Sequence, residues 1–63
     1  MNLEGKIAVV TGGTKGIGYG IAESLVKAGC KTFICGRNAN DVMFAVVRLS
    51  ELGEVAGAAK EGG

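Results

Sequence analysis

A glycine-rich turn, Thr11-Gly12-Gly13-Thr14-Lys15-Gly16-Ile17-Gly18, is the stretch of this sequence whose residue types and spacing could do chemistry. Gly12 can take backbone angles that other residues avoid, and Gly16 and Gly18 have no side chain to keep a ligand away from the main chain. The turn leads into a segment with helical spacing, and the unpaired N–H groups and the dipole at the start of a helix attract anions. The sequence therefore predicts a turn that binds the diphosphate of a dinucleotide.

Two other interpretations of the turn compete with this one. A tight strand-to-helix turn that binds nothing is the simpler alternative. A mononucleotide-binding P-loop is excluded because it needs Gly-Lys followed by Ser or Thr, whereas Lys15 is followed by Gly16. The dinucleotide interpretation is favoured because the glycines lie between an apolar, strand-like run at residues 6–11 and an amphipathic helix.

The turn resembles the TGxxxGxG cofactor motif of the short-chain dehydrogenase/reductase family, with Thr11 followed by glycines at 12, 16 and 18. The likeness extends from about Leu3 to Gly53. Tropinone-reductase-like members of the family have stretches similar to Tyr19-Gly20-Ile21 and Cys35-Gly36-Arg37-Asn38. This resemblance implies a nicotinamide-dependent oxidoreductase on a Rossmann-type sheet. It also implies that the diphosphate and ribose are held by Gly12, Thr14, Lys15, Gly16, Ile17 and Gly18, and the adenosine phosphate by Arg37 and Asn38.

The end of the second predicted strand favours NADP over NAD as the cofactor. NAD-binding folds of this kind place an acidic residue there, about 20 residues after the glycines, to bind the ribose 2′-hydroxyl. This position lies near Gly36 and is not acidic, whereas Arg37 offers a planar guanidinium that suits a phosphate and Lys15 adds a second cation. The alternative for Arg37 is a solvated loop residue. Asp41, the nearest carboxylate, is assigned to the first turn of the next helix.

A strand and a helix flank the turn. Residues 6–11 form an apolar run without alternation, which is typical of a parallel strand covered on both faces. Residues 16–28 have helical spacing, with a cap at Thr14 and an end at Gly29. The predicted apolar side of this helix is Ile17, Ile21, Leu25 and Ala28, and its other side is Tyr19, Glu23, Ser24 and Lys27.

The second half of the chain repeats this order of strand and helix. Residues 31–35 predict a strand, and a helix follows from a cap at Asn38 or Asn40 to about Leu52, closed by Gly53. Its predicted inner stripe is Val42, Ala45, Val46, Leu49 and Leu52. Off this stripe lie Met43, Phe44 and Val47, either as loose surface or as a surface for a partner. Residues 54–59 weakly predict a third strand, because Ala and Gly are poor strand formers.

These elements predict an α/β fold, a partial Rossmann arrangement β-α-β-α(-β) with parallel strands over residues 1–63. Right-handed crossovers place both helices on one side of the sheet and leave the other side bare. No fourth strand is found to cover the first strand's free edge, which invites aggregation or another chain. We therefore expect the N-terminal part of a longer cofactor-binding domain, incomplete as a standalone domain.

Composition narrows the class of protein. The 63 residues are 48% hydrophobic and 21% charged with a formal net charge of +1, which indicates one small globular domain without the basic tract of a nucleic-acid binder. No apolar run approaches the roughly 18 residues that span a membrane. The N-terminus lacks the features of a secretory signal, so a cytoplasmic location is expected.

The cysteines and the missing catalytic motif limit the chemistry further. Cys30 and Cys35 at the two ends of one strand would lie roughly 16 Å apart, too far for a disulfide, and are expected to be buried or half-buried thiols. Without His, a zinc site is not predicted. The family's chemistry needs Tyr-x-x-x-Lys with a Ser and an Asn, but Glu23 stands four residues after the only tyrosine, Tyr19, so no catalytic residue is assigned.

Two functions follow. The first is the NADP(H)-binding segment of an enzyme that, when intact, transfers hydride between NADP(H) and a carbonyl or secondary alcohol. The second is a non-catalytic dinucleotide-binding or interaction module, which could form an oligomer or complement another chain. The expected partner is the dinucleotide, with a small-molecule substrate only in an intact protein.

The family has an Asp-Val pair after the third strand that frames the adenine of the cofactor. If the third strand of this chain starts at Val55, this pair falls on Glu61 and Gly62.

Overall fold

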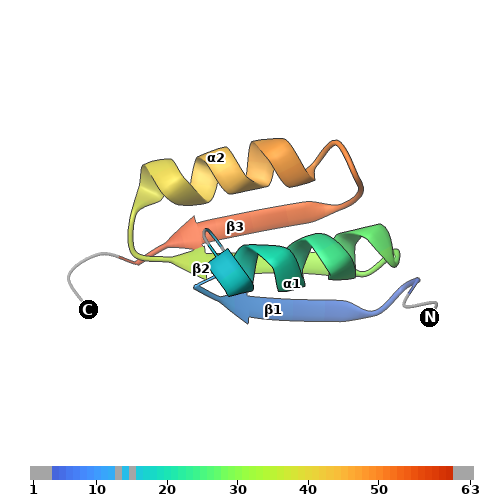
Figure 1. The fold of residues 1–63 in the computed structure, drawn as a ribbon. Helices are drawn as coiled ribbons and strands as arrows, with labels where there is room; N and C mark the ends of the chain where they lie inside the picture. The colour runs from blue at the N-terminus through green and yellow to red at the C-terminus, as the bar shows by residue number, and fades with distance from the viewer. Residues whose placement is uncertain (1–3, 13, 15, 61–63) are drawn as a thin grey trace.

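The structure is a computed structural model that describes residues 4–12, 14 and 16–60. Its elements are β1 (Ile7–Thr11), α1 (Gly16–Lys27), β2 (Lys31–Gly36), α2 (Ala39–Leu49) and β3 (Val55–Ala59) (Figure 1). The three strands are parallel and lie in the order β1-β2-β3. The predicted β-α-β-α-β arrangement is therefore confirmed, including the third strand that the sequence indicated only weakly.

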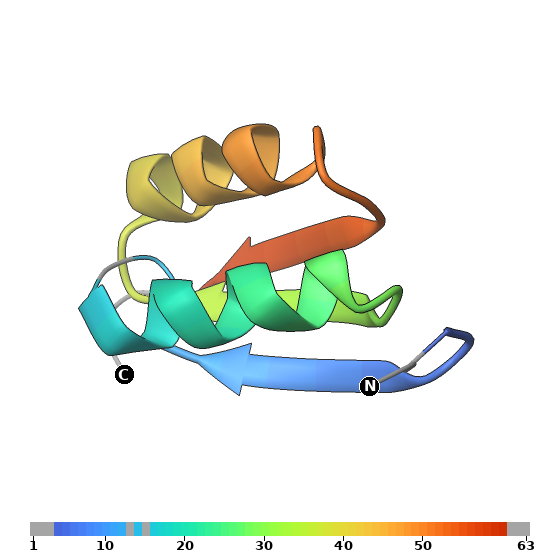
Figure 2. The same ribbon diagram turned by 45° about the vertical axis from the view of Figure 1, so that its right-hand side comes forward.

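Both helices cover the same face of the sheet, as Figures 1 and 2 show from two directions. Helix α1 packs on β1 and β2, and α2 packs on β2 and β3. Two successive crossovers of the same hand produce this arrangement. Because the strands are parallel, the turn after β1 and the start of α2 meet at the carboxyl end of the sheet, where the arrowheads point in Figure 1.

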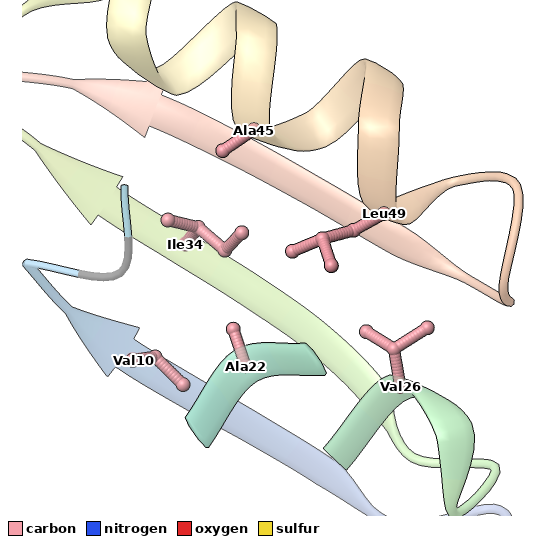
Figure 3. Packing of buried hydrophobic residues seen from close by; sticks show 6 residues of the cluster. All are labelled: Val10, Ala22, Val26, Ile34, Ala45 and Leu49. Atoms are coloured by element: carbon pink, nitrogen blue, oxygen red, sulfur yellow. The ribbon is translucent and has the colours of Figure 1, made fainter. Parts of the chain in front are cut away.

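The hydrophobic core lies between this face and the two helices (Figure 3). Its buried cluster is Val10, Ala22, Val26, Ile34, Ala45 and Leu49, drawn from two strands and both helices. Successive strand residues point to opposite faces, so Thr32 and Ile34 are buried under the helices while Phe33 lies on the other side. The Thr32 hydroxyl is buried too, and it donates a hydrogen bond to the Cys30 carbonyl at 3.2 Å.

The other face of the sheet is open, as predicted. Ile7 is 77% exposed and Val9 is 64% exposed, and the register sets Val9 beside Phe33. We call Ile7, Val9 and Phe33 the open-face cluster. The apolar run of β1 predicted a strand covered on both faces, but α1 and α2 cover only one of them.

The predicted inner side of α1 is wrong for Ile17 and Ile21 and right for Leu25. Ile17 is 84% exposed and Ile21 is 50% exposed, whereas Ala22 and Val26 are buried in the core. Tyr19 and Leu25 pack beside this cluster, so Tyr19 is on the core side rather than the polar side. The helix carries two apolar stripes of similar spacing, and the sheet takes the one that includes Ala22, because a small side chain lets the helix approach closely.

The end of α1 is confirmed. Gly29 has φ +90°, and its N–H donates to the Val26 carbonyl at 3.0 Å. The N–H of Cys30 donates to the Leu25 carbonyl at 3.0 Å. This pair of bonds is the Schellman motif, in which a left-handed glycine satisfies the last carbonyls of a helix. The predicted cap at Thr14 stays a prediction, because Lys15, directly before the helix, lies outside the described residues.

Helix α2 ends three residues earlier than predicted. Ser50 is its C-cap residue, and its hydroxyl donates to the Val47 carbonyl at 2.8 Å. Leu52 therefore leaves the predicted inner stripe and is 44% exposed, whereas Val42, Ala45 and Leu49 are buried as expected. A Cβ on Gly53 would lie 3.0 Å from Val26 Cγ1, so Gly53 lies close against the last turn of α1.

Two smaller expectations can be checked directly. Cys30 is buried and Cys35 is partly buried, and both are free thiols, as predicted. The Cys30 Sγ donates to the Lys6 carbonyl at 3.3 Å. In the part of the chain that the structure describes, neither helix has the length and apolar character needed to cross a bilayer.

Candidate dinucleotide-binding site

The glycine turn leaves β1 through a residue that needs a left-handed backbone. Gly12 has φ +70°, and its N–H donates to the Cys35 carbonyl at 2.8 Å, which ties the turn to the end of β2. Gly16 at the start of α1 also has a positive φ, +59°. A Cβ built on Gly12 or Gly16 would meet nothing within 4 Å, so the glycines are required by conformation and leave open space above the main chain.

Gly36 lets the turn lie directly on the end of β2. A Cβ at Gly36 would be 3.0 Å from Thr14 Cγ2 and 3.0 Å from Val42 Cγ2. Thr14 of the turn and Val42 of α2 therefore close on this glycine from the helix-covered side. In the sequence, the position near Gly36 stood out only for its lack of an acidic residue, and this packing role was not predicted.

A hollow of about 390 Å³ opens at the carboxyl ends of the strands. The residues that line it are Thr11, Gly12, Cys35, Gly36, Arg37 and Lys60. Among the described residues that line it, the charged ones are Arg37 and Lys60, and both are exposed cations. The hollow therefore has the charge and the position expected for an anion at the end of a parallel sheet.

The first turn of α1 borders the glycine turn. It contains no acidic residue that would repel an anion from the N-terminus of the helix. Ile17 is exposed there, and Gly18 is partly exposed. Lys15, the second cation of the sequence prediction, lies outside the described residues, as do Glu61 and Gly62, on which the adenine-framing pair was expected.

Asn38 is the N-cap of α2. Its Oδ1 accepts from the backbone N–H of Asn40 at 2.9 Å and from that of Asp41 at 3.2 Å. Of the two candidates for this cap, Asn38 is therefore the one the structure selects. The side-chain oxygen of Asn38 serves the helix, so only the amide nitrogen is left to contact a ligand. Asn38 follows Arg37, but it does not line the hollow.

The hollow brings together only some of the predicted site residues. Gly12 and Arg37 line it. Thr14 does not line it but lies next to Gly36, which does. The other described residues of the prediction lie at the start of α1: Gly16, Ile17 and Gly18. Lys60 was missed by sequence reasoning. The signal that could have found it is the rule that ligands of parallel sheets lie at the carboxyl ends of the strands, applied to the third strand as well as to the first two.

The arrangement offers main-chain amides and two cations, the groups that bind phosphate esters. The only tyrosine, Tyr19, is partly buried against the core and not in the hollow. Among residues 4–12, 14 and 16–60, no three His, Cys, Asp or Glu side chains gather as they would around a metal ion. The groups that the described residues offer at this end of the sheet are thus ones suited to a phosphorylated ligand.

Comparisons with known proteins give the same family. Residues 6–60 match the family model of short chain dehydrogenases. A rhamnolipid-biosynthesis 3-oxoacyl-[acyl-carrier-protein] reductase of Pseudomonas aeruginosa is 47% identical over 53 residues, which cover 84% of this chain and 21% of that protein. A tropinone reductase homolog of Datura stramonium is 49% identical over 41 residues, which cover 65% of this chain and 15% of that protein.

The fold agrees with a solved structure of a relative. The structure of Pseudomonas aeruginosa RhlG, described as an NADP active-site complex, superimposes with a TM-score of 0.91 and 42% identity over 95% of this chain and 24% of that one. The chain thus spans less than a quarter of the length of these relatives. With the family model matched from residue 6 to residue 60, the chain belongs to the short-chain dehydrogenase family.

Proposed function

We propose that this chain is the part of an NADP(H)-dependent short-chain dehydrogenase that binds the diphosphate and the adenosine phosphate of the cofactor. The observation that carries the proposal is the meeting of the left-handed turn at Gly12, the start of α1 and the Arg37 cation at one end of the sheet. The RhlG structure, a relative described with NADP, supports this choice of cofactor.

The residues of the turn and of the end of β2 fit such a ligand in different ways. The diphosphate and ribose would be held by Gly12, Thr14, Lys15, Gly16, Ile17 and Gly18. The open space above Gly12 and Gly16 lets a ligand come close to the main chain. The Gly12 N–H is bonded to the Cys35 carbonyl, so the first amides of α1 provide the donors. The adenosine phosphate would be bound by Arg37, with the amide nitrogen of Asn38 as a further donor. The bound cofactor would supply the hydride.

The rest of the function concerns a longer protein. In intact form, we infer, the enzyme transfers hydride between NADP(H) and a carbonyl or secondary alcohol, and a Tyr-x-x-x-Lys pair outside these 63 residues acts on the proton. Residues 1–63 would then be the N-terminal part of its cofactor domain. The cytoplasmic location stays a prediction.

The second candidate function is a non-catalytic dinucleotide-binding or interaction module. It is favoured by the open-face cluster and by the exposed Met43, Phe44 and Val47 on α2. The DNA sequence downstream of the Gly63 codon distinguishes the two candidate functions. A continuing frame with Tyr-x-x-x-Lys about a hundred residues later supports the dehydrogenase, given the usual size of α/β domains. A stop codon there supports the module.

Dissociation constants for NADPH and NADH test the cofactor assignment. We expect the chain to bind NADPH more tightly, and Arg37→Gln to weaken NADPH binding by about 10- to 150-fold while leaving NADH nearly unchanged, because a charge-assisted contact is worth about 1.5 to 3 kcal/mol. Arg48→Gln is the matched control, since Arg48 lies over the Phe44 ring of α2, 5.5 Å from its centroid, and outside the hollow.

The same comparison can be made in a longer protein. Residues 6–60 of this chain would replace the matching segment of the Pseudomonas aeruginosa reductase, and KM for NADPH and NADH would be measured with and without Arg37→Gln. Equal affinities for the two cofactors, or tighter NADH, would overturn the assignment of Arg37.

A further inference from the structure

We propose that Lys60 is a second cation for the adenosine phosphate, which would then be bound between the ends of β2 and β3 rather than by the end of β2 alone. This inference rests on the proposed function and adds to it a residue that determines cofactor specificity. Neither the glycine motif nor the Arg37 position points to Lys60.

The backbone sets Lys60 beside the end of β2. Ala59, the last residue of β3, pairs with Gly36, the last residue of β2. The Lys60 N–H donates to the Gly36 carbonyl at 2.9 Å and extends the ladder by one step. Neighbouring strands lie about 4.8 Å apart, so Arg37 and Lys60 leave the sheet side by side.

Both cations lie at the edge of the same hollow on the surface. Of the residues that the structure describes, Arg37 and Lys60 are the charged ones that line it, and Gly12 of the glycine turn lines it with them. Like charges on neighbouring positions repel each other. A phosphate monoester carries a charge of about −1.5 to −2 near neutral pH, so one such group can pair with both cations at once.

The chemistry distinguishes this role from a contact to the diphosphate. A cation on the 2′-phosphate of the adenosine strengthens NADPH binding and has nothing to contact in NADH. A cation on the diphosphate, which both cofactors share, strengthens both. Lys60 is exposed, so its contribution is screened by salt and we expect it to be at the lower end for a charge-assisted contact.

Titrations of Lys60→Gln, Lys60→Arg and the unaltered chain with NADPH and NADH test the proposal. We expect Lys60→Gln to weaken NADPH binding by about 10-fold and NADH binding by less than about twofold. Lys60→Arg should restore the preference. The NADPH affinity of Lys60→Gln should also fall less steeply than that of the unaltered chain between low and physiological ionic strength, because one charged contact is missing.

Lys27→Gln is the matched control, since it removes the same charge at the far end of α1. If Lys27→Gln and Lys60→Gln lose the same NADPH affinity, the effect is one of net charge and the proposal is overturned. The proposal is also overturned if Lys60→Gln loses the same affinity for NADPH as for NADH. The backbone bond of Lys60 is kept in both of its variants, and circular dichroism checks that they fold.

The failure of this inference is distinguishable from the failure of the proposed function. If the unaltered chain does not prefer NADPH, the proposed function fails and Lys60 loses its role with it. If the chain prefers NADPH, depends on Arg37, and binds equally well with Lys60→Gln, only the role of Lys60 is overturned.

Discussion

Gly12 and Gly20 are both glycines with free space where a Cβ would lie, yet their backbones place opposite demands on the residue. Gly12 has a left-handed φ of +70°, whereas Gly20 lies inside α1. An L side chain in the left-handed region is strained, and glycine inside a helix is less favourable than alanine because it loses more freedom on folding.

We therefore expect the same added methyl group to have opposite effects at these two glycines. Gly12→Ala should lower the free energy of unfolding by about 1 to 2 kcal/mol, and Gly20→Ala should raise it by about 0.5 to 1 kcal/mol. Urea unfolding followed by circular dichroism measures both. A Gly12→Ala variant as stable as the unaltered chain would contradict the left-handed turn.

The side chain of Asn38 gives a second prediction at the scale of the residue. Its Oδ1 accepts from two orphan N–H groups at the start of α2, so Asn38→Ala should cost about 1 kcal/mol in the free energy of unfolding. Asn38→Asp keeps an acceptor at the cap and should retain most of the stability. If Asn38→Ala unfolds at the same urea concentration as the unaltered chain, the cap contributes nothing.

Residue types alone could predict part of the site. Gly12 and Asn38 were found because a left-handed turn and a helix cap each admit few residue types. Lys60 and the contact of Gly36 with Thr14 were not found. Lys60 reaches the site only through the pairing of β3 with β2, and the Gly36 contact depends on how the turn after β1 lies on the end of β2.

At the scale of the element, the close approach of α2 to β3 depends on a glycine. A Cβ on Gly57 would lie 2.7 Å from Val42 Cγ1, 2.9 Å from Val46 Cγ2 and 3.0 Å from the Ile34 carbonyl oxygen. The glycine that makes β3 a weak strand by propensity is thus the residue that lets the helix lie on it.

We expect Gly57→Ala to destabilise the chain by about 1 to 3 kcal/mol, because the core cannot absorb the extra methyl group without a shift. Adding Val46→Ala should recover part of this loss, a coupling that a double-mutant cycle measures. The control is Gly20→Ala, which adds the same group in open space. Additive effects of Gly57→Ala and Val46→Ala would show that α2 does not press on β3.

The order and type of all five elements followed from turns, caps and apolar spacing. The inner side of α1 did not, because Ile17 and Ile21 form a stripe as regular as that of Ala22 and Val26, and only the packing against β1 and β2 decides between them. The end of α2 was misplaced because Ser50 is the C-cap residue, whereas Gly53 was expected to close the helix.

For the whole molecule, the main feature is a sheet covered on one face. Ile7, Val9 and Phe33 form the open-face cluster, and β1 has a free edge in the three-stranded sheet. The relatives that this chain matches are more than four times as long as the matching segment. An unpaired edge beside exposed apolar side chains is prone to association with another chain.

We expect the isolated chain to self-associate through this face, and Val9→Lys to reduce that association, because a charge in the middle of the cluster opposes contact between apolar surfaces. Sedimentation velocity over a range of protein concentrations measures the effect. Val47→Lys is the matched control, since Val47 is also exposed, at 60%, but lies on α2. A larger effect of the control would move the association surface to α2.

The most direct test of the central claim is to map the binding of NADPH on the isotope-labelled chain by the shifts of its backbone amide signals in NMR spectra. The account predicts that the largest shifts fall on Gly12, Gly16, Gly18 and Arg37, at the carboxyl end of the sheet. Shifts confined to the open-face cluster or to the outer side of α2, with the turn unchanged, would contradict it, as would a spectrum that NADPH leaves unaltered.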